Sequence, residues 1–109
     1  MEQENRNVLL YVSHYYNKYY ESQEAQELPE AVKKELLMNL IFISEEAGGV
    51  CELFFDEEGH VVVDSYCEEG DLGYDEVAAR LLVSEMEHKE KEVLEQVENW
   101  HRLKESGAL

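Results

Sequence analysis

The sequence lacks positive charge where its negative charge is concentrated. Between Cys51 and Glu76 it has ten acidic residues and no lysine or arginine, and His60 is the one residue there that can carry a positive charge. The whole chain of 109 residues has a formal net charge of −17 at pH 7. A field of this sign repels phosphate backbones and anionic lipids and attracts cations and basic proteins. We therefore expect no nucleic acid and no membrane surface among its partners, and a basic protein surface as the matching kind of partner.

Several other features are scarce. The two cysteines, Cys51 and Cys67, are too few for a disulfide framework and form no C-x-x-C pair. The apolar run 40–43 is far shorter than the roughly 20 residues that cross a bilayer. The first residues, MEQENRN, lack the basic and apolar regions of a secretory signal. These absences predict a reduced, cytoplasmic protein.

Length and composition are those of a folded domain. A chain of 109 residues with 44% hydrophobic residues can bury a core of its own without disulfides or a metal ion. We expect one domain over residues 1–109.

The first half of the chain predicts two helices. Residues 8–20, VLLYVSHYYNKYY, place apolar side chains at helical spacing and predict a tyrosine-rich N-terminal helix, although tyrosine and valine also favour strands. The single proline, Pro29, suits the first turn of a second helix. Apolar residues nearly surround that second helix, which predicts a central, buried position. Gly48 and Gly49 are expected to end it.

A β-hairpin follows, and the sequence indicates its register. The loop 57–59, Glu-Glu-Gly, suits a type I turn closed by a left-handed glycine. Shifting the pairing by one residue would mix the apolar and polar faces. The favoured register forms one apolar face by pairing Phe55 with Val61, Leu53 with Val63, and Cys51 with Ser65.

The last segment predicts a long C-terminal helix that begins near Asp75. Its apolar stripe is interrupted by the polar residues 88–92 and resumes with Val93, Val97 and Trp100. A gap of that length indicates that the distal half packs elsewhere, and we predict a homodimer through these three residues. The alternative is that the helix packs wholly within its own domain.

The predicted fold is therefore α+β. An antiparallel β-hairpin packs on the central buried helix, with the tyrosine-rich N-terminal helix and the long C-terminal helix beside it. The expected core takes residues from three periodic segments: Leu36, Leu40, Ile43, Leu53, Phe55, Val61, Val63, Val77 and Leu81.

The sequence has no recognisable catalytic motif. It contains no glycine-rich phosphate loop, no H-E-x-x-H and no G-x-S-x-G. Two Glu-x-x-His pairs, 85–88 and 98–101, lie on one predicted helix and point about 140° apart, so they cannot face each other as in a di-metal bundle. Cys51 lies on the apolar face of the hairpin and is expected in the core rather than as a nucleophile. We expect a non-enzymatic protein without catalytic residues or a cofactor.

The acidic middle of the chain is the candidate functional region. It predicts a protein–protein interaction or regulatory module in which acids steer a basic partner and an apolar patch gives affinity. The alternative is a divalent-cation site, for calcium or magnesium, in residues 56–75, because both ions prefer oxygen ligands. A third interpretation is that the acids only keep the protein soluble. The predicted partner-binding residues are Glu57, Glu58, Glu68, Glu69, Asp71 and Trp100. The predicted cation ligands are Asp56, Glu57, Glu58, Glu68, Glu69, Asp71 and Asp75.

Short motifs along the chain carry a resemblance to a known family. They are Gly48-Gly49-Val50, Phe55-Asp56-Glu57-Glu58-Gly59, Glu69-Gly70-Asp71 and Tyr74-Asp75-Glu76-Val77, with Tyr19-Tyr20, Leu28-Pro29 and Glu35-Leu36 in the front half. In these motifs the chain resembles a family of small acidic bacterial proteins of unknown function. The resemblance implies the same arrangement of strand, turn and helix and brings no assigned activity.

Overall fold

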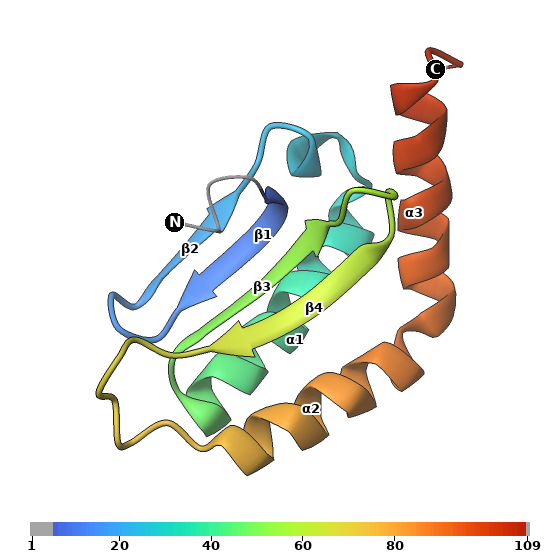
Figure 1. Ribbon diagram of the computed structural model, residues 1–109. Helices are drawn as coiled ribbons and strands as arrows, with labels where there is room; N and C mark the ends of the chain where they lie inside the picture. Colours follow the sequence, from blue (N-terminus) through green and yellow to red (C-terminus); the bar gives the residue numbers. More distant parts are fainter. Residues whose placement is uncertain (1–5, 109) are drawn as a thin grey trace.

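The computed structural model describes residues 6–108 and has an α+β fold (Figure 1). One antiparallel sheet has the strand order β2-β1-β3-β4. The strands are β1 (Asn7–Ser13), β2 (Lys18–Glu21), β3 (Val50–Phe55) and β4 (Val61–Tyr66). The helices are the short 3₁₀ helix η2 (Ala25–Glu27), α1 (Glu30–Ala47), α2 (Glu76–Lys89) and α3 (Lys91–Glu105).

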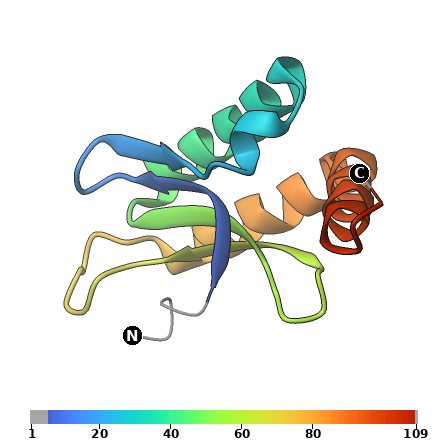
Figure 2. The same cartoon turned by 90° about the horizontal axis from the view of Figure 1, so that it is seen from above.

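The helices gather on one side of the sheet. α1 lies across β1 and β3, α2 lies below β4, and α3 runs up beside the end of β4 (Figures 1 and 2). The opposite face of the sheet carries no helix among residues 6–108 (Figure 2). In that same part of the chain, no helix combines the length and the hydrophobicity needed to cross a bilayer.

The predicted N-terminal helix is wrong, because residues 8–20 form the hairpin of β1 and β2. Asn17, with φ of 54°, turns the chain between the two strands. β1 pairs with β3, and a bulge between Val8 and Leu10 adds one residue, so that Leu9 and Leu10 are both buried. Pairing with a central strand thus overrides the weak helical spacing, in agreement with the strand preference of tyrosine and valine.

The predicted position of the second helix is confirmed by α1, but the prediction that this helix is buried nearly all round is not. Leu36, Leu40 and Ile43 are buried against the sheet. Met38 and Phe42 are more than half exposed, so α1 is not buried all round. Gly48 and Gly49 end the helix with φ of 86° and 72°. A side chain at Gly49 would place its Cβ only 2.3 Å from the carbonyl oxygen of Tyr66, so this position also needs glycine for space.

The predicted register of the β3–β4 hairpin is confirmed. Phe55 pairs with Val61, Leu53 with Val63 and Cys51 with Ser65. Gly59 closes the turn with φ of 84°, and its N–H donates to the carbonyl of Asp56. The alternation of side chains therefore identified both faces of this hairpin correctly.

The predicted long C-terminal helix is two helices. The first of them, α2, begins after Asp75, as expected, and the carboxylate of Asp75 caps it by accepting from the N–H of Ala78 at 2.9 Å. The chain then bends at Glu90, within the polar stretch 88–92, and α3 turns toward β4 (Figure 1). Because of this bend, the second apolar stripe packs on the chain's own core. Leu94 and Val97 are buried, and Val93 and Trp100 pack against this core.

Six of the nine expected core residues are buried: Leu36, Leu40, Ile43, Leu53, Phe55 and Val63. Val61 packs against them and is partly buried. The prediction is wrong for Val77 and Leu81, which are exposed on the outer face of α2. α2 has apolar residues on both faces, and its inner face uses Ala79 and Met86.

Truncating Phe55 tests this core. Phe55 is 2% exposed and its ring stacks on the ring of His101, with centroids 3.7 Å apart. Phe55→Ala is expected to lower the free energy of unfolding by about 3–5 kcal/mol, measured by denaturant titration. Phe42→Ala removes the same side chain from an exposed position and is the control, with an expected loss below about 1 kcal/mol. Equal losses in the two variants would contradict the burial described here.

Candidate functional site

The predicted partner-binding acids form two separate groups at opposite ends of β4. Glu57 and Glu58 lie in the β3–β4 turn, whereas Glu68, Glu69 and Asp71 lie in the loop that leads to α2. β4 has six residues, which at ~3.3 Å each separate the groups by about 20 Å. The structure therefore does not assemble one acidic site.

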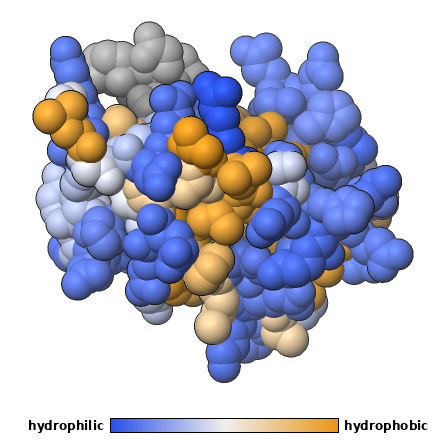
Figure 3. Space-filling view, turned by 90° about the horizontal axis from the view of Figure 1, so that it is seen from below, coloured by the Kyte–Doolittle hydropathy of each residue, from blue (hydrophilic) through white to orange (hydrophobic). Residues whose placement is uncertain are grey.

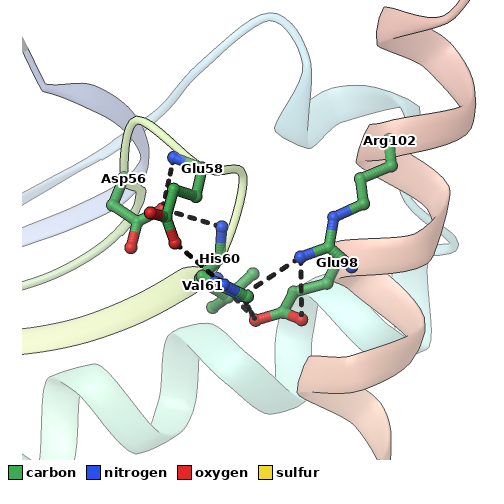
Figure 4. A network of polar contacts seen from close by, with 6 residues as sticks. All are labelled: Asp56, Glu58, His60, Val61, Glu98 and Arg102. Carbon is green, nitrogen blue, oxygen red and sulfur yellow. Dashed lines mark hydrogen bonds and ion pairs between the residues drawn. The ribbon is translucent and has the colours of Figure 1, made fainter.

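Within the β3–β4 turn, acidic and basic side chains hold the hairpin to α3 (Figure 4). The carboxylate of Asp56 accepts from the N–H groups of Glu58 and His60, each at 2.9 Å. These and neighbouring backbone N–H groups lower the pKa of Asp56, although burial opposes the shift. Glu98 of α3 accepts from the N–H of Val61 at 2.8 Å, and Arg102 lies 3.1 Å from the ring of His60. The network is structural: it fixes α3 beside the end of β4.

Asp71 also has a structural partner. The hydroxyl of Tyr15 donates to its carboxylate at 2.5 Å and accepts from the N–H of Glu68 at 2.8 Å. The loop before α2 is thereby tied to the turn between β1 and β2. Of the predicted acids, Glu57, Glu58, Glu68 and Glu69 remain exposed.

The open face of the sheet contains a buried carboxylate that the sequence did not mark. Glu52, in the middle of β3, is 1% exposed. It accepts from Arg6 at 2.9 Å and from the hydroxyl of Tyr66 at 2.8 Å. Arg6 also contacts Asp64 at 3.1 Å and lies over the ring of Phe54. Burial, together with the bond to Glu52, raises the pKa of Tyr66. Arg6 therefore pairs with both carboxylates, and the buried Glu52 is not left without a partner.

The predicted dimer surface is used within the chain. Val97 is buried, and Val93 and Trp100 pack on the chain's own core. The neighbouring His101, which the sequence suggested only as a weak metal motif, is buried between Phe55 and the carboxylate of Glu24, 2.6 Å away. The premise of an unpartnered stripe is therefore wrong, and the alternative of packing within the domain is the one observed.

The described residues form neither a metal site nor a reactive cysteine. In residues 6–108 no three His, Cys, Asp or Glu side chains are placed to hold a metal ion. Cys51 is fully buried, and burial, followed by the charges of Asp64 and Glu52, raises its pKa to about 12. A thiol in this state is a poor nucleophile at neutral pH.

The feature that stands out is an exposed apolar surface on the two helices that cover the sheet. Met38 and Phe42 on α1 are 59% and 53% exposed, and Val77 and Leu81 on α2 are 70% and 62% exposed. We call these four residues the α1–α2 apolar surface. α1 and α2 pack against each other. Hydrophobic side chains gather on the lower face of the molecule, where α2 lies (Figure 3).

A hollow between the helices adjoins this surface. It has a volume of about 730 Å³ and is lined by Met38 and Phe42 on one side and by Lys89 and Glu90 at the helix bend. Glu90 is 3% exposed, and its carboxylate accepts from the side chain of Asn39 at 3.0 Å. Burial, and then a hydrogen bond with the carboxyl of Glu35, raises the pKa of Glu90.

Comparison with known families identifies the family of the chain. A family model matches residues 6–107, nearly the whole chain. The chain belongs to DUF6145, a family of unknown function. The match confirms the assignment to a family of unknown function that the sequence motifs suggested. No curated protein and no solved structure matches the chain.

The buried Glu90 predicts a pH effect with a defined sign. Its folded-state pKa is raised, so the folded protein binds a proton more readily there than the unfolded chain does. Its contribution is unfavourable at neutral pH and is relieved as the pH falls through the raised pKa toward the ordinary value of 4.5. Glu90→Gln keeps an acceptor for Asn39 and is expected to be more stable than the wild type at pH 7.

Denaturant titration at several pH values between 7 and 5 measures this difference. The advantage of Glu90→Gln over the wild type is expected to shrink as the pH falls. The exposed Glu87→Gln on the same helix is the control and is expected to show no such trend. An advantage for Glu90→Gln that is absent at pH 7, or that does not change with pH, would contradict the assignment.

Proposed function

We propose that this protein is a non-enzymatic interaction module whose α1–α2 apolar surface binds a basic protein. The observation that carries the proposal is the exposure of Met38, Phe42, Val77 and Leu81 on two adjoining helices that already have a complete inner face. Scattered apolar residues are ordinary at a protein surface, but four large ones on paired helices are typical of a binding site.

The inner faces of both helices show that these residues are not required by the fold. α1 buries Leu36, Leu40 and Ile43, and α2 buries Ala79 and Met86. The outer residues lie on the opposite sides of the same helices. Their burial by a partner would remove apolar area from water, at about 25 cal/mol per Å².

The charge of the chain supports a basic partner. α1 and α2 together carry seven acidic and four basic residues, in agreement with the overall net charge of −17. Two copies of such a chain repel each other, whereas a basic protein is attracted. The exposed Glu68 and Glu69 lie in the loop that leads into α2 and would contribute to this attraction. Glu57 and Glu58, at the far end of β4, would act only through the long-range field.

Removal of the surface tests the proposal. The double variant Phe42→Ser, Leu81→Ser is expected to lose its partner, with a dissociation constant raised about tenfold or more, which corresponds to 1.4 kcal/mol. Its free energy of unfolding is expected to stay within about 1 kcal/mol of the wild type, because both positions are exposed. The measurement is a quantitative affinity purification from the native extract, followed by calorimetry with the purified partner.

The matched control is Tyr16→Ser, Tyr19→Ser, which removes two aromatic side chains that are 63% and 59% exposed on the β1–β2 hairpin. This control is expected to retain the partner. Binding is also expected to weaken with added salt, because screening reduces attraction between opposite charges. A partner that both variants retain equally, or a partner that is itself acidic, would refute the proposal.

A further inference from the structure

The edge strand β4 leaves hydrogen-bonding groups of its backbone unpaired. In an antiparallel pair, residues alternate between those whose N–H and C=O face the partner strand and those whose groups face away. The N–H of Asp56 donates to the carbonyl of His60 at the end of the hairpin. Counted from this pair, the strand register directs the backbone N–H and C=O groups of every second residue of β4 away from β3. These residues are Val61, Val63 and Ser65.

Glu98 of α3 covers the first of these outward groups, the N–H of Val61 (Figure 4). For Val63 and Ser65, no hydrogen bond to an outward backbone group occurs within residues 6–108. Unpaired backbone groups along a sheet edge can pair with an added strand.

The two edges of the sheet differ in their protection. β2 has four residues and begins with Lys18, and short, lysine-bearing edges resist the addition of a strand. β4 has six residues and contains neither lysine nor proline. β4 therefore lacks both of these protections, and its edge faces α2 across a groove.

A groove of about 610 Å³ lies along this edge. Residues 63–67 form one wall, and one flank of α2 forms the other. The lining residues of α2 recur at three- and four-residue steps and make a continuous wall: Glu76, Ala79, Arg80, Val83, Ser84 and Glu87. A strand edge that faces the flank of a helix is the arrangement in which peptide-binding domains add an extended ligand strand.

We propose that the groove between β4 and α2 binds an extended segment of a partner protein as a fifth strand of the sheet. The part of β4 that lines the groove, residues 63–66, sets a segment of about four residues at ~3.3 Å each. Alternate side chains of that segment would face Ala79 and Val83, which favours apolar residues there. The groove is lined by residues of α2 other than Val77 and Leu81, so the inference does not depend on the proposed function.

The charges of the groove specify the segment further. Asp64 is paired with Arg6, and Glu76 is paired with Arg80 at 3.1 Å. Glu87 is exposed and adds a negative charge to the same wall. The segment is therefore expected to carry a lysine or arginine that faces Glu87. A second copy of this chain fits poorly, because each copy carries a net charge of −17.

The test uses a phage-displayed library of random ten-residue peptides selected on the full-length protein. Enriched peptides are expected to alternate apolar residues with others and to include a basic residue. Each enriched peptide is then added to ¹⁵N-labelled protein. It is expected to slow hydrogen exchange at the amides of Val63 and Ser65, because a bound strand accepts from them.

Ser84→Trp is the variant, since Ser84 is exposed and lines the groove, and a tryptophan there would occupy it. It is expected to weaken peptide binding about tenfold or more, which is 1.4 kcal/mol. Gln96→Trp places the same side chain at an exposed site on α3 and is expected to bind as the wild type does. Thermal unfolding of both variants verifies that they fold.

Three results would overturn the inference. One is the absence of any enriched peptide. Another is a bound peptide that leaves the amides of Val63 and Ser65 unchanged; shifts confined to the α1–α2 apolar surface would then support the proposed function alone. The third is protection of these amides that grows with protein concentration without peptide, which would show pairing of β4 between two copies.

Discussion

The burial of β3 on both of its faces is the constraint on which the rest of the structure depends. β3 pairs with β1 on one side and with β4 on the other, and all of its residues except Phe54 are buried. Its helix-side residues contact the core under α1 and α3. Its other face places Glu52 where only a paired charge is tolerated, and Arg6 and Tyr66 provide the partners. The burial of β3 therefore depends on residues of the neighbouring segments, such as Arg6 and Tyr66, that provide these partners.

Glu90 has a comparable effect on the C-terminal half. A continuous helix from Asp75 would carry Leu94, Val97 and Trp100 away from the sheet. The bend at Glu90 instead returns them to the core and places α3 against the end of β4. The cost is a buried carboxylate next to Glu35, with a raised pKa. The same arrangement leaves the outer face of α2 and its flank beside β4 open, and these are the two surfaces proposed to bind partners.

The acidic side chains of residues 51–76 have two roles, which the composition alone does not distinguish. Glu52, Asp56, Asp64, Asp71 and Asp75 accept hydrogen bonds or pair with Arg6, and each holds a turn, a cap or a strand in place. Glu57, Glu58, Glu68, Glu69 and Glu76 are exposed and contribute to the field around the molecule. A sequence with ten acids in this stretch can therefore be strongly acidic without forming one acidic site.

The sequence by itself determined the elements whose cause is local. The alternation of residues 51–65 determined the hairpin register, the glycines determined the end of α1, and Asp75 determined the start of α2, because each depends on neighbours within a few residues. Tertiary structure decided the rest. Residues 8–20 form strands because β3 offers them a pairing edge, and Val77 and Leu81 are exposed because α2 has two apolar faces and packing selects one. The α1–α2 apolar surface and the groove beside β4 are formed by elements that are distant in the sequence. For that reason no local sequence pattern predicted them.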